Sequence, residues 1–153
     1  MRISADQDIV DLTTTDLPQL RQLLYSNGLS FEDCHEQSNH FIGMFKGDRL
    51  IAAGGIEYLG KTGLLRSVAV ATDCRGIGLG ACIVKQLQRR AARQGVRALY
   101  LLTETAAGYF YTLGYQLLNR ENLPIEVTQT KQFSLLCPDS AQVMVIELVA
   151  DKS

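Results

Sequence analysis

The stretch "TDCRGIGLGA", residues 72–81, sets an arginine directly ahead of three alternating glycines. Glycines leave the backbone N–H groups accessible to a ligand, and a guanidinium suits phosphate oxygens. The stretch stands between a segment of strand type and one of helix type, and the N–H groups that begin a helix bind anions. These features predict a phosphate-binding turn, since a plain strand-to-helix turn would need only one of the glycines.

Two nucleotide ligands fit this spacing. Gly76, Gly78 and Ala81 satisfy the G-x-G-x-x-G/A fingerprint of dinucleotide-binding folds, and Glu104 ends the next predicted strand. A doubly wound sheet needs several more parallel strands than the rest of the chain offers, and a predicted hairpin precedes the turn. An NAD-binding domain is therefore kept as an alternative. We favour a pyrophosphate cradle for an acyl-coenzyme A.

The composition describes one globular domain over residues 1–153 that has no need of a nucleic-acid or membrane partner. Net charge is −1, and 46% of the residues are hydrophobic, so no basic surface is expected. No signal peptide and no membrane span are visible, which predicts a cytoplasmic protein. The cysteines lie far apart without a C-x-x-C pair, and this spacing predicts reduced thiols and no metal site: Cys34, Cys74, Cys82 and Cys137.

Apolar periodicity predicts an alternation of helices and strands, which is a mixed α/β (α+β) fold with a βαβ unit at its centre. Helices are predicted at 13–28, 30–37, 81–95 and 105–115. Strands are predicted as a hairpin at 39–60 and as single strands at 64–72, 96–104, 115–119 and 141–150, with 123–133 a loop or a helix.

"RGIGLG" matches the R/Q-x-x-G-x-G/A motif of the GNAT N-acetyltransferase superfamily, with Arg75, Gly78 and Gly80 at the defining positions. The resemblance covers nearly the whole chain, including "LLRSVAVA" before the motif and "YFYTLGY" after it. It implies a GNAT fold, in which splayed parallel strands of a mixed central sheet are flanked by helices. "TKQFSLLCPDSAQVM", residues 130–144, further resembles the arsenic-resistance-associated branch, which is similar to amino-acid acetyltransferases.

The resemblance implies that acetyl-coenzyme A (acetyl-CoA) binds between the splayed strands. Backbone groups of Val68, Ala69 and Val70 would bind the pantetheine arm, and one N–H would donate to the thioester oxygen, an effect worth roughly 3 kcal/mol. The pyrophosphate would lie on the glycine turn. The other residues expected to bind the cofactor are Arg75, Gly76, Ile77, Gly78, Leu79, Gly80, Ala81, Thr103 and Phe110.

Acetyl transfer to an amine needs a proton acceptor and then a proton donor for the leaving thiolate. We expect Glu57 to be the base. Many members of the superfamily have a tyrosine as donor where this chain has Phe110, so Tyr109 is named as the acid and an acyl-CoA-binding sensor without catalysis stays an alternative. Neither Tyr109 nor Tyr111 is a simple replacement, because neighbouring helix positions point in different directions.

The predicted function is N-acetylation of a small amine, an amino acid or an analogue, with a link to arsenic detoxification implied by the branch. Arg66 interrupts an apolar strand and would bind a substrate carboxylate or form an ion pair with Glu57. Ser67 and Glu104 are further substrate candidates, and Glu104 is a second candidate base. By the resemblance, residues 130–141 close over the acceptor or form a homodimer contact, and Cys137 could contact arsenic.

Overall fold

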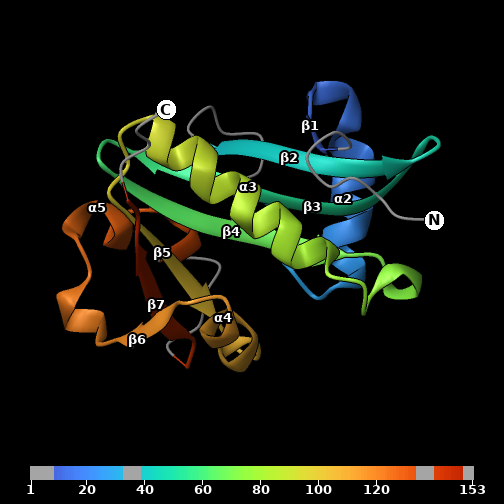
Figure 1. Cartoon of the computed structure of the whole chain (residues 1–153). Coiled ribbons are helices and arrows are strands. Elements are labelled where there is room, and N and C mark those ends of the chain that lie inside the picture. The colour runs from blue at the N-terminus through green and yellow to red at the C-terminus, as the bar shows by residue number, and fades with distance from the viewer. Residues whose placement is uncertain (1–8, 33–38, 134–139, 150–153) are drawn as a thin grey trace.

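The computed structural model describes residues 9–32, 39–133 and 140–149, which form one mixed sheet with helices on both faces (Figure 1). The seven strands are β1 (Ile9–Asp11), β2 (Asn39–Lys46), β3 (Arg49–Leu59), β4 (Thr62–Val70), β5 (Ala98–Thr103), β6 (Gln116–Leu118) and β7 (Gln142–Glu147). The α-helices are α2 (Leu17–Ser26), α3 (Leu79–Arg93), α4 (Ala107–Thr112) and α5 (Ile125–Thr128). Short 3₁₀ turns lie at η1 (Thr14–Asp16), η2 (Thr72–Cys74) and η3 (Arg120–Asn122).

The strand order is β1-β2-β3-β4-β5-β7-β6, and within the described residues β4 and β5 are the only parallel neighbours. Helix α3 connects these two strands, as the predicted βαβ unit requires. A doubly wound sheet has a run of parallel strands, and this sheet has a single parallel pair. The dinucleotide-binding alternative is therefore wrong for this chain.

Helices α3 and α2 cover opposite faces of the sheet (Figure 1). On α3 the residues at helical spacing, Ile83, Val84, Leu87 and Ala91, are all fully buried, as their pattern predicts. The helix lies so close to the sheet that a Cβ on Gly54 would stand 2.6 Å from the Ile83 side chain. This close approach lets α3 pack directly against β3, the strand next to β4.

The first helix is set by local signals. Asp16 accepts a hydrogen bond from the backbone N–H of Thr13 at 2.8 Å, which caps the entry into η1 and α2, and Pro18 stands in the first turn of α2. At the other end of α2, Gly28 has a φ of +71°, and the N–H of Leu29 donates to the carbonyl of Leu24 at 2.9 Å. The end of this helix is therefore held by its own backbone.

Most predicted elements are confirmed, including the hairpin of β2 and β3 that turns at Gly47 and Asp48. Strand β1, which pairs with β2, was not predicted, because three residues give too short a pattern. Within 123–133 the structure has a one-turn helix, α5. The predicted helix at 30–37 and the residues around Cys137 lie largely outside the described residues. Among the helices that are described, none is long and apolar enough to cross a membrane.

Candidate active site

A cleft opens where β4 and β5 separate. The two strands pair only from Thr62–Leu64 to Ala98–Tyr100, and beyond these residues they diverge. The space between them has a volume of about 890 Å³. Its walls are residues 65–70 of β4, 101–106 at and after the end of β5, 74–76 and 78–80 of the glycine turn, 27–30 after α2, and Tyr109, Phe110 and Gln132.

A β-bulge bends β4 away from β5. Ala69 lies opposite Ala53 and Arg66 lies opposite Gly55, so Ser67 and Val68 together face the single residue Gly54. Ser67 has a φ of 58°, and it is the only described residue other than glycine with a positive φ. Such a conformation costs on the order of 1–3 kcal/mol and is found mainly at functional sites. The bulge places backbone groups of β4 in the wall of the cleft, where the sequence predicted cofactor-binding backbone.

The glycine turn forms the end of the cleft. Gly76 and Gly78 have φ of +87° and +84°, and a Cβ at either position would meet no atom within 4 Å. These glycines are therefore required by backbone conformation, and the space above them is open to a ligand. Gly78 is the N-cap of α3, so the N–H groups of Leu79, Gly80 and Ala81 have no partner inside the helix, whereas that of Cys82 donates to the Gly78 carbonyl. Leu79 is buried and anchors the turn.

Gly80 allows Tyr109 of α4 to reach the start of α3. A Cβ at Gly80 would stand 2.7 Å from the Tyr109 hydroxyl oxygen. Burial raises the pKa of Tyr109 above its ordinary value, and nearby Cys82 raises it further. An ordinary tyrosine is already protonated at neutral pH, and the raised pKa keeps Tyr109 in this form, which is the form that can donate a proton.

The neighbouring aromatic residues are arranged differently. Phe110 is buried, lines the cleft, and makes edge-to-face contacts with Tyr109 and Tyr115. Tyr111 is 69% exposed and does not line the cleft. Of the two tyrosines that flank Phe110, the tertiary structure brings only Tyr109 to the site.

Arg66 lies buried in the cleft wall, with 3% of its surface exposed. Its Nη1 donates to the Asn39 side-chain oxygen at 3.2 Å and its Nε donates to the Ser67 hydroxyl at 3.1 Å, while the guanidinium lies 5.7 Å from the Phe41 ring centroid. The registers of β2, β3 and β4 put Asn39, Arg66 and Glu57 on the same face of the sheet.

Three predicted residues, Glu57, Ile77 and Ala81, are not among those that line the cleft. Glu57 lies on β3 opposite Leu64, beside the point where β4 and β5 separate, and it is partly buried. Ile77 points to solvent and is 66% exposed. Glu104 and Thr103 do line the cleft, and the Thr103 hydroxyl accepts a hydrogen bond from the N–H of Ala106 at 3.0 Å, which shapes the turn into α4.

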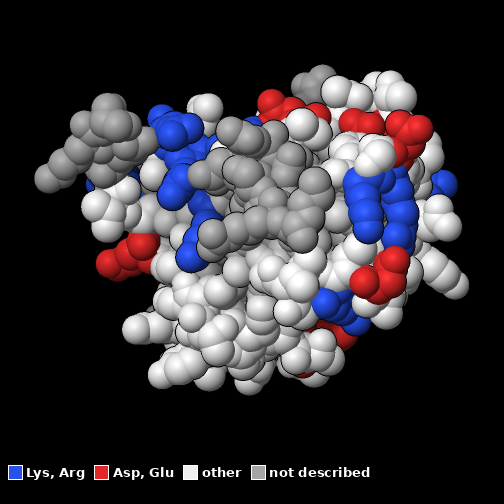
Figure 2. Space-filling view, turned by 45° about the vertical axis from the view of Figure 1, so that its right-hand side comes forward, with Lys and Arg blue, Asp and Glu red and all other residues white. Residues whose placement is uncertain are grey.

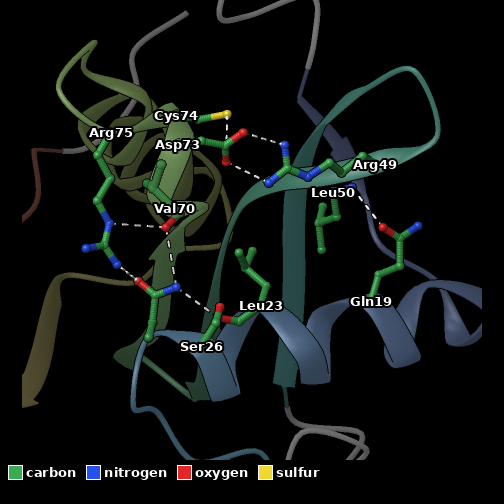
Figure 3. A network of polar contacts seen from close by, with 10 residues as sticks. Gln19, Leu23, Ser26, Arg49, Leu50, Val70, Asp73, Cys74 and Arg75 are labelled. Atoms are coloured by element: carbon green, nitrogen blue, oxygen red, sulfur yellow. Dashed lines mark hydrogen bonds and ion pairs between the residues drawn. The ribbon is translucent and has the colours of Figure 1, made fainter.

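Residues 27–30, after α2, also line the cleft, and sequence reasoning missed them. Their only signal was Asn27-Gly28 at a helix end, which indicates a turn and no ligand. Asn27 accepts a hydrogen bond from Arg75 Nη2 at 2.7 Å, and Figure 3 shows Arg75 turned toward Val70. On the face in Figure 2, basic and acidic residues of the described chain stand in separate small groups.

The model of the acetyltransferase (GNAT) family matches residues 7–115, which include the glycine turn and the two strands of the cleft. The match spans more than half of the chain, and the protein belongs to this family. The resemblance of "RGIGLG" to the GNAT motif is thereby confirmed.

Individual relatives are more distant. An amino-acid acetyltransferase of Mannheimia succiniciproducens is 25% identical over 135 residues, which are 82% of this chain and 31% of that protein. N-acetylglutamate synthase of Neisseria gonorrhoeae, in complex with coenzyme A and N-acetyl-glutamate, has a TM-score of 0.79 at 16% identity over 92% of this chain and 35% of the synthase. The ribosomal-protein-S18-alanine N-acetyltransferase of Escherichia coli has a TM-score of 0.71 at 18% identity, over 95% and 96% of the two chains. The chain thus spans about a third of the first two proteins, and the two structures share its fold.

Proposed function

We propose that the protein transfers an acetyl group from acetyl-CoA to the amine of a small molecule, an amino acid or an analogue of one. The observation that carries the proposal is the cleft between β4 and β5, which ends at the open glycine turn. An extended thioester fits between diverging strands, and a pyrophosphate fits the N–H groups at the start of α3. The matching family model and the amino-acid acetyltransferase relative support the same activity.

The residues present suit the cofactor. Gly76 and Gly78 leave the turn free of side chains, so phosphate oxygens can approach the backbone. In the β4 wall, Val68, Ala69 and Val70 offer backbone groups to a pantetheine arm, and Arg75 lines the cleft next to Gly76. The cofactor supplies an activated acetyl group as a thioester. The protein supplies orientation and hydrogen-bond donors at fixed positions.

Proton transfers fall to Tyr109, which lines the cleft, and to Glu57, which lies beside the cleft on β3. Tyr109 is the proton donor to the leaving sulfur in this proposal, because it lines the cleft and its hydroxyl is protonated at neutral pH. Glu57 accepts the proton of the acceptor ammonium through water, and Glu104, which lines the cleft, is the alternative base. A tyrosine donor beside Phe110 favours an enzyme over a sensor.

An acceptor that carries a carboxylate would be held by Arg66. Arg66 is only 3% exposed and its guanidinium is hydrogen-bonded to Asn39, so its orientation is already set. Binding of a carboxylate would therefore cost little side-chain entropy. Ser67 holds the Nε of the same arginine. This arrangement favours amino acids over simple alkyl amines.

The link to arsenic rests on the resemblance of residues 130–144, of which 134–139 lie outside the described residues. We therefore propose to test this link by comparing the turnover of an arsenic-containing amino acid with that of its arsenic-free analogue. The homodimer contact expected of 130–141 is likewise a proposal, which the molar mass in solution would test.

The test is release of free thiol from acetyl-CoA over a panel of amino acids, their decarboxylated amines and an amino-terminal alanine peptide. We expect turnover with amino acids and at least about tenfold less with the amines that lack the carboxylate. Binding of acetyl-CoA without turnover on any member would favour the sensor. In a thermal-shift comparison, stabilisation by NAD and none by acetyl-CoA would refute the cofactor assignment.

A further inference from the structure

The side chain of Asn27, at the end of α2, bridges two parts of the cleft wall. Its Nδ2 donates to the carbonyl oxygens of Leu23 at 2.9 Å and Val70 at 3.3 Å. Its Oδ1 accepts from Arg75 Nη2 at 2.7 Å. The amide thus joins the last turn of α2, the end of β4 and the arginine of the glycine motif.

This arrangement fixes the orientation of the amide. If the Asn27 oxygen and nitrogen exchanged places, the NH₂ group would face the guanidinium of Arg75, and the oxygen would face two carbonyls. Three hydrogen bonds would be lost together. The amide therefore presents an acceptor to Arg75 in a defined direction.

The contacts also decide which part of Arg75 is left for a ligand. Its Nε donates to the Val70 carbonyl at 3.4 Å, as the dashed line between these two labelled residues in Figure 3 shows, and its Nη2 donates to Asn27. Within the described residues Nη1 makes no hydrogen bond. An exposed arginine otherwise samples many rotamers, and two anchors on the protein side remove that freedom before a ligand arrives.

We propose that Asn27 is a positioning residue for the phosphates of the cofactor: it holds Arg75, which lines the cleft together with Gly76 and Gly78, so that Nη1 is left to bind a phosphate oxygen. The inference rests on the proposed use of acetyl-CoA. It adds a residue outside the glycine motif, some fifty positions earlier in the chain, that contributes to cofactor affinity without contacting the cofactor through its own amide.

The neighbouring Ser26 provides a matched control. Its hydroxyl donates to the same Leu23 carbonyl at 2.9 Å, and among the described residues no hydrogen bond joins it to Arg75. Ser26→Ala therefore removes one side-chain bond at the same helix end, while Asn27→Ala removes the bridge as well. Both variants should fold, because the end of α2 is held by the backbone bonds of Gly28 and Leu29.

The experiment measures the dissociation constants of coenzyme A and of pantetheine, which lacks the phosphates, by titration calorimetry, together with the melting temperature. For Asn27→Ala we expect coenzyme A to bind about fivefold to tenfold more weakly, with unchanged affinity for pantetheine. Ser26→Ala should bind both as the wild type does. In the Arg75→Ala background, Asn27→Ala should cause no further loss, because Asn27 acts through Arg75.

Three results would overturn the inference while leaving the proposed function in place. The first is wild-type coenzyme A affinity in Asn27→Ala. The second is an equal loss for coenzyme A and pantetheine, which would indicate a general structural defect. The third is additive losses in the double variant. A wild-type protein that binds no coenzyme A would refute the proposed function and this inference together, so the two failures are distinguishable.

Discussion

Replacing Gly80 by alanine tests the role of Tyr109 as proton donor while both side chains proposed for proton transfer, Tyr109 and Glu57, are kept. The new Cβ would stand 2.7 Å from the Tyr109 hydroxyl oxygen, whereas ordinary contacts begin at 3.4 Å. The hydroxyl must therefore move by about 0.7 Å, the difference between these distances. It can do so because it is the far end of a side chain that is 43% exposed.

Stability and activity should respond in opposite directions. Gly80 lies in α3 without a positive φ, so alanine is favoured there by up to about 1 kcal/mol of unfolding free energy, and less in a first turn. Misplacing a catalytic group by about 1 Å can lower a rate about a hundredfold. We expect kcat to fall about tenfold in Gly80→Ala, with an unchanged or slightly higher melting temperature. The KM for acetyl-CoA should change little, because the GNAT motif accepts alanine at this position.

The assay is thiol release under saturating acetyl-CoA and acceptor, beside a thermal melt. Tyr109→Phe is the control: it removes the oxygen that the new Cβ would meet. Gly80→Ala should therefore cause no further loss of kcat in the Tyr109→Phe background. A kcat within twofold of wild type in both single variants would refute the assignment of Tyr109 as proton donor.

Three further predictions concern the turn, the base and acid stability. Gly78→Glu should weaken coenzyme A binding at least about tenfold by placing bulk and negative charge in the cradle. Gly78→Ala separates that effect from the strain at φ +84°, and tight binding by both variants would contradict the cradle. Glu57→Gln should lower kcat at least about tenfold with little change in coenzyme A affinity; an unchanged pH–rate profile would remove Glu57 as the base. The hydrogen bonds from Arg49, at 2.6 and 2.8 Å, lower the pKa of Asp73 to about 2 from its ordinary 3.8. A lowered carboxyl pKa stabilises the fold above about pH 4, and this contribution is lost as the pH falls toward 2. Asp73→Asn should flatten that part of the pH dependence of the urea midpoint, and an identical dependence in both proteins would contradict the ion pair.

The elements of this fold were largely predictable, because each depends on neighbours in the sequence. The helical spacing of Ile83, Val84, Leu87 and Ala91 reports a face that packs on a sheet, and all four are buried. Strand β1 escaped prediction because its three residues owe their conformation to pairing with β2.

The part of the candidate site that would bind the phosphates of acetyl-CoA could also be predicted from the sequence. A turn that binds phosphate through backbone N–H groups needs glycines at fixed spacing. Gly76 and Gly78 therefore indicate this turn in the sequence, whatever the rest of the chain does. The positive φ at both positions confirms that only glycine suits them. The sequence thus determined the helix-and-strand pattern and the turn, because both depend on contiguous residues.

Tertiary structure alone decided which side chains meet at the cleft. The register of three strands put Arg66 beside Asn39, the close approach of α4 to Gly80 selected Tyr109 over Tyr111, and the end of α2 brought Asn27 to Arg75. These pairs are separated by 27, 29 and 48 positions in the chain. No local pattern records such distances, because side-chain contacts across the sheet depend on how whole elements pack.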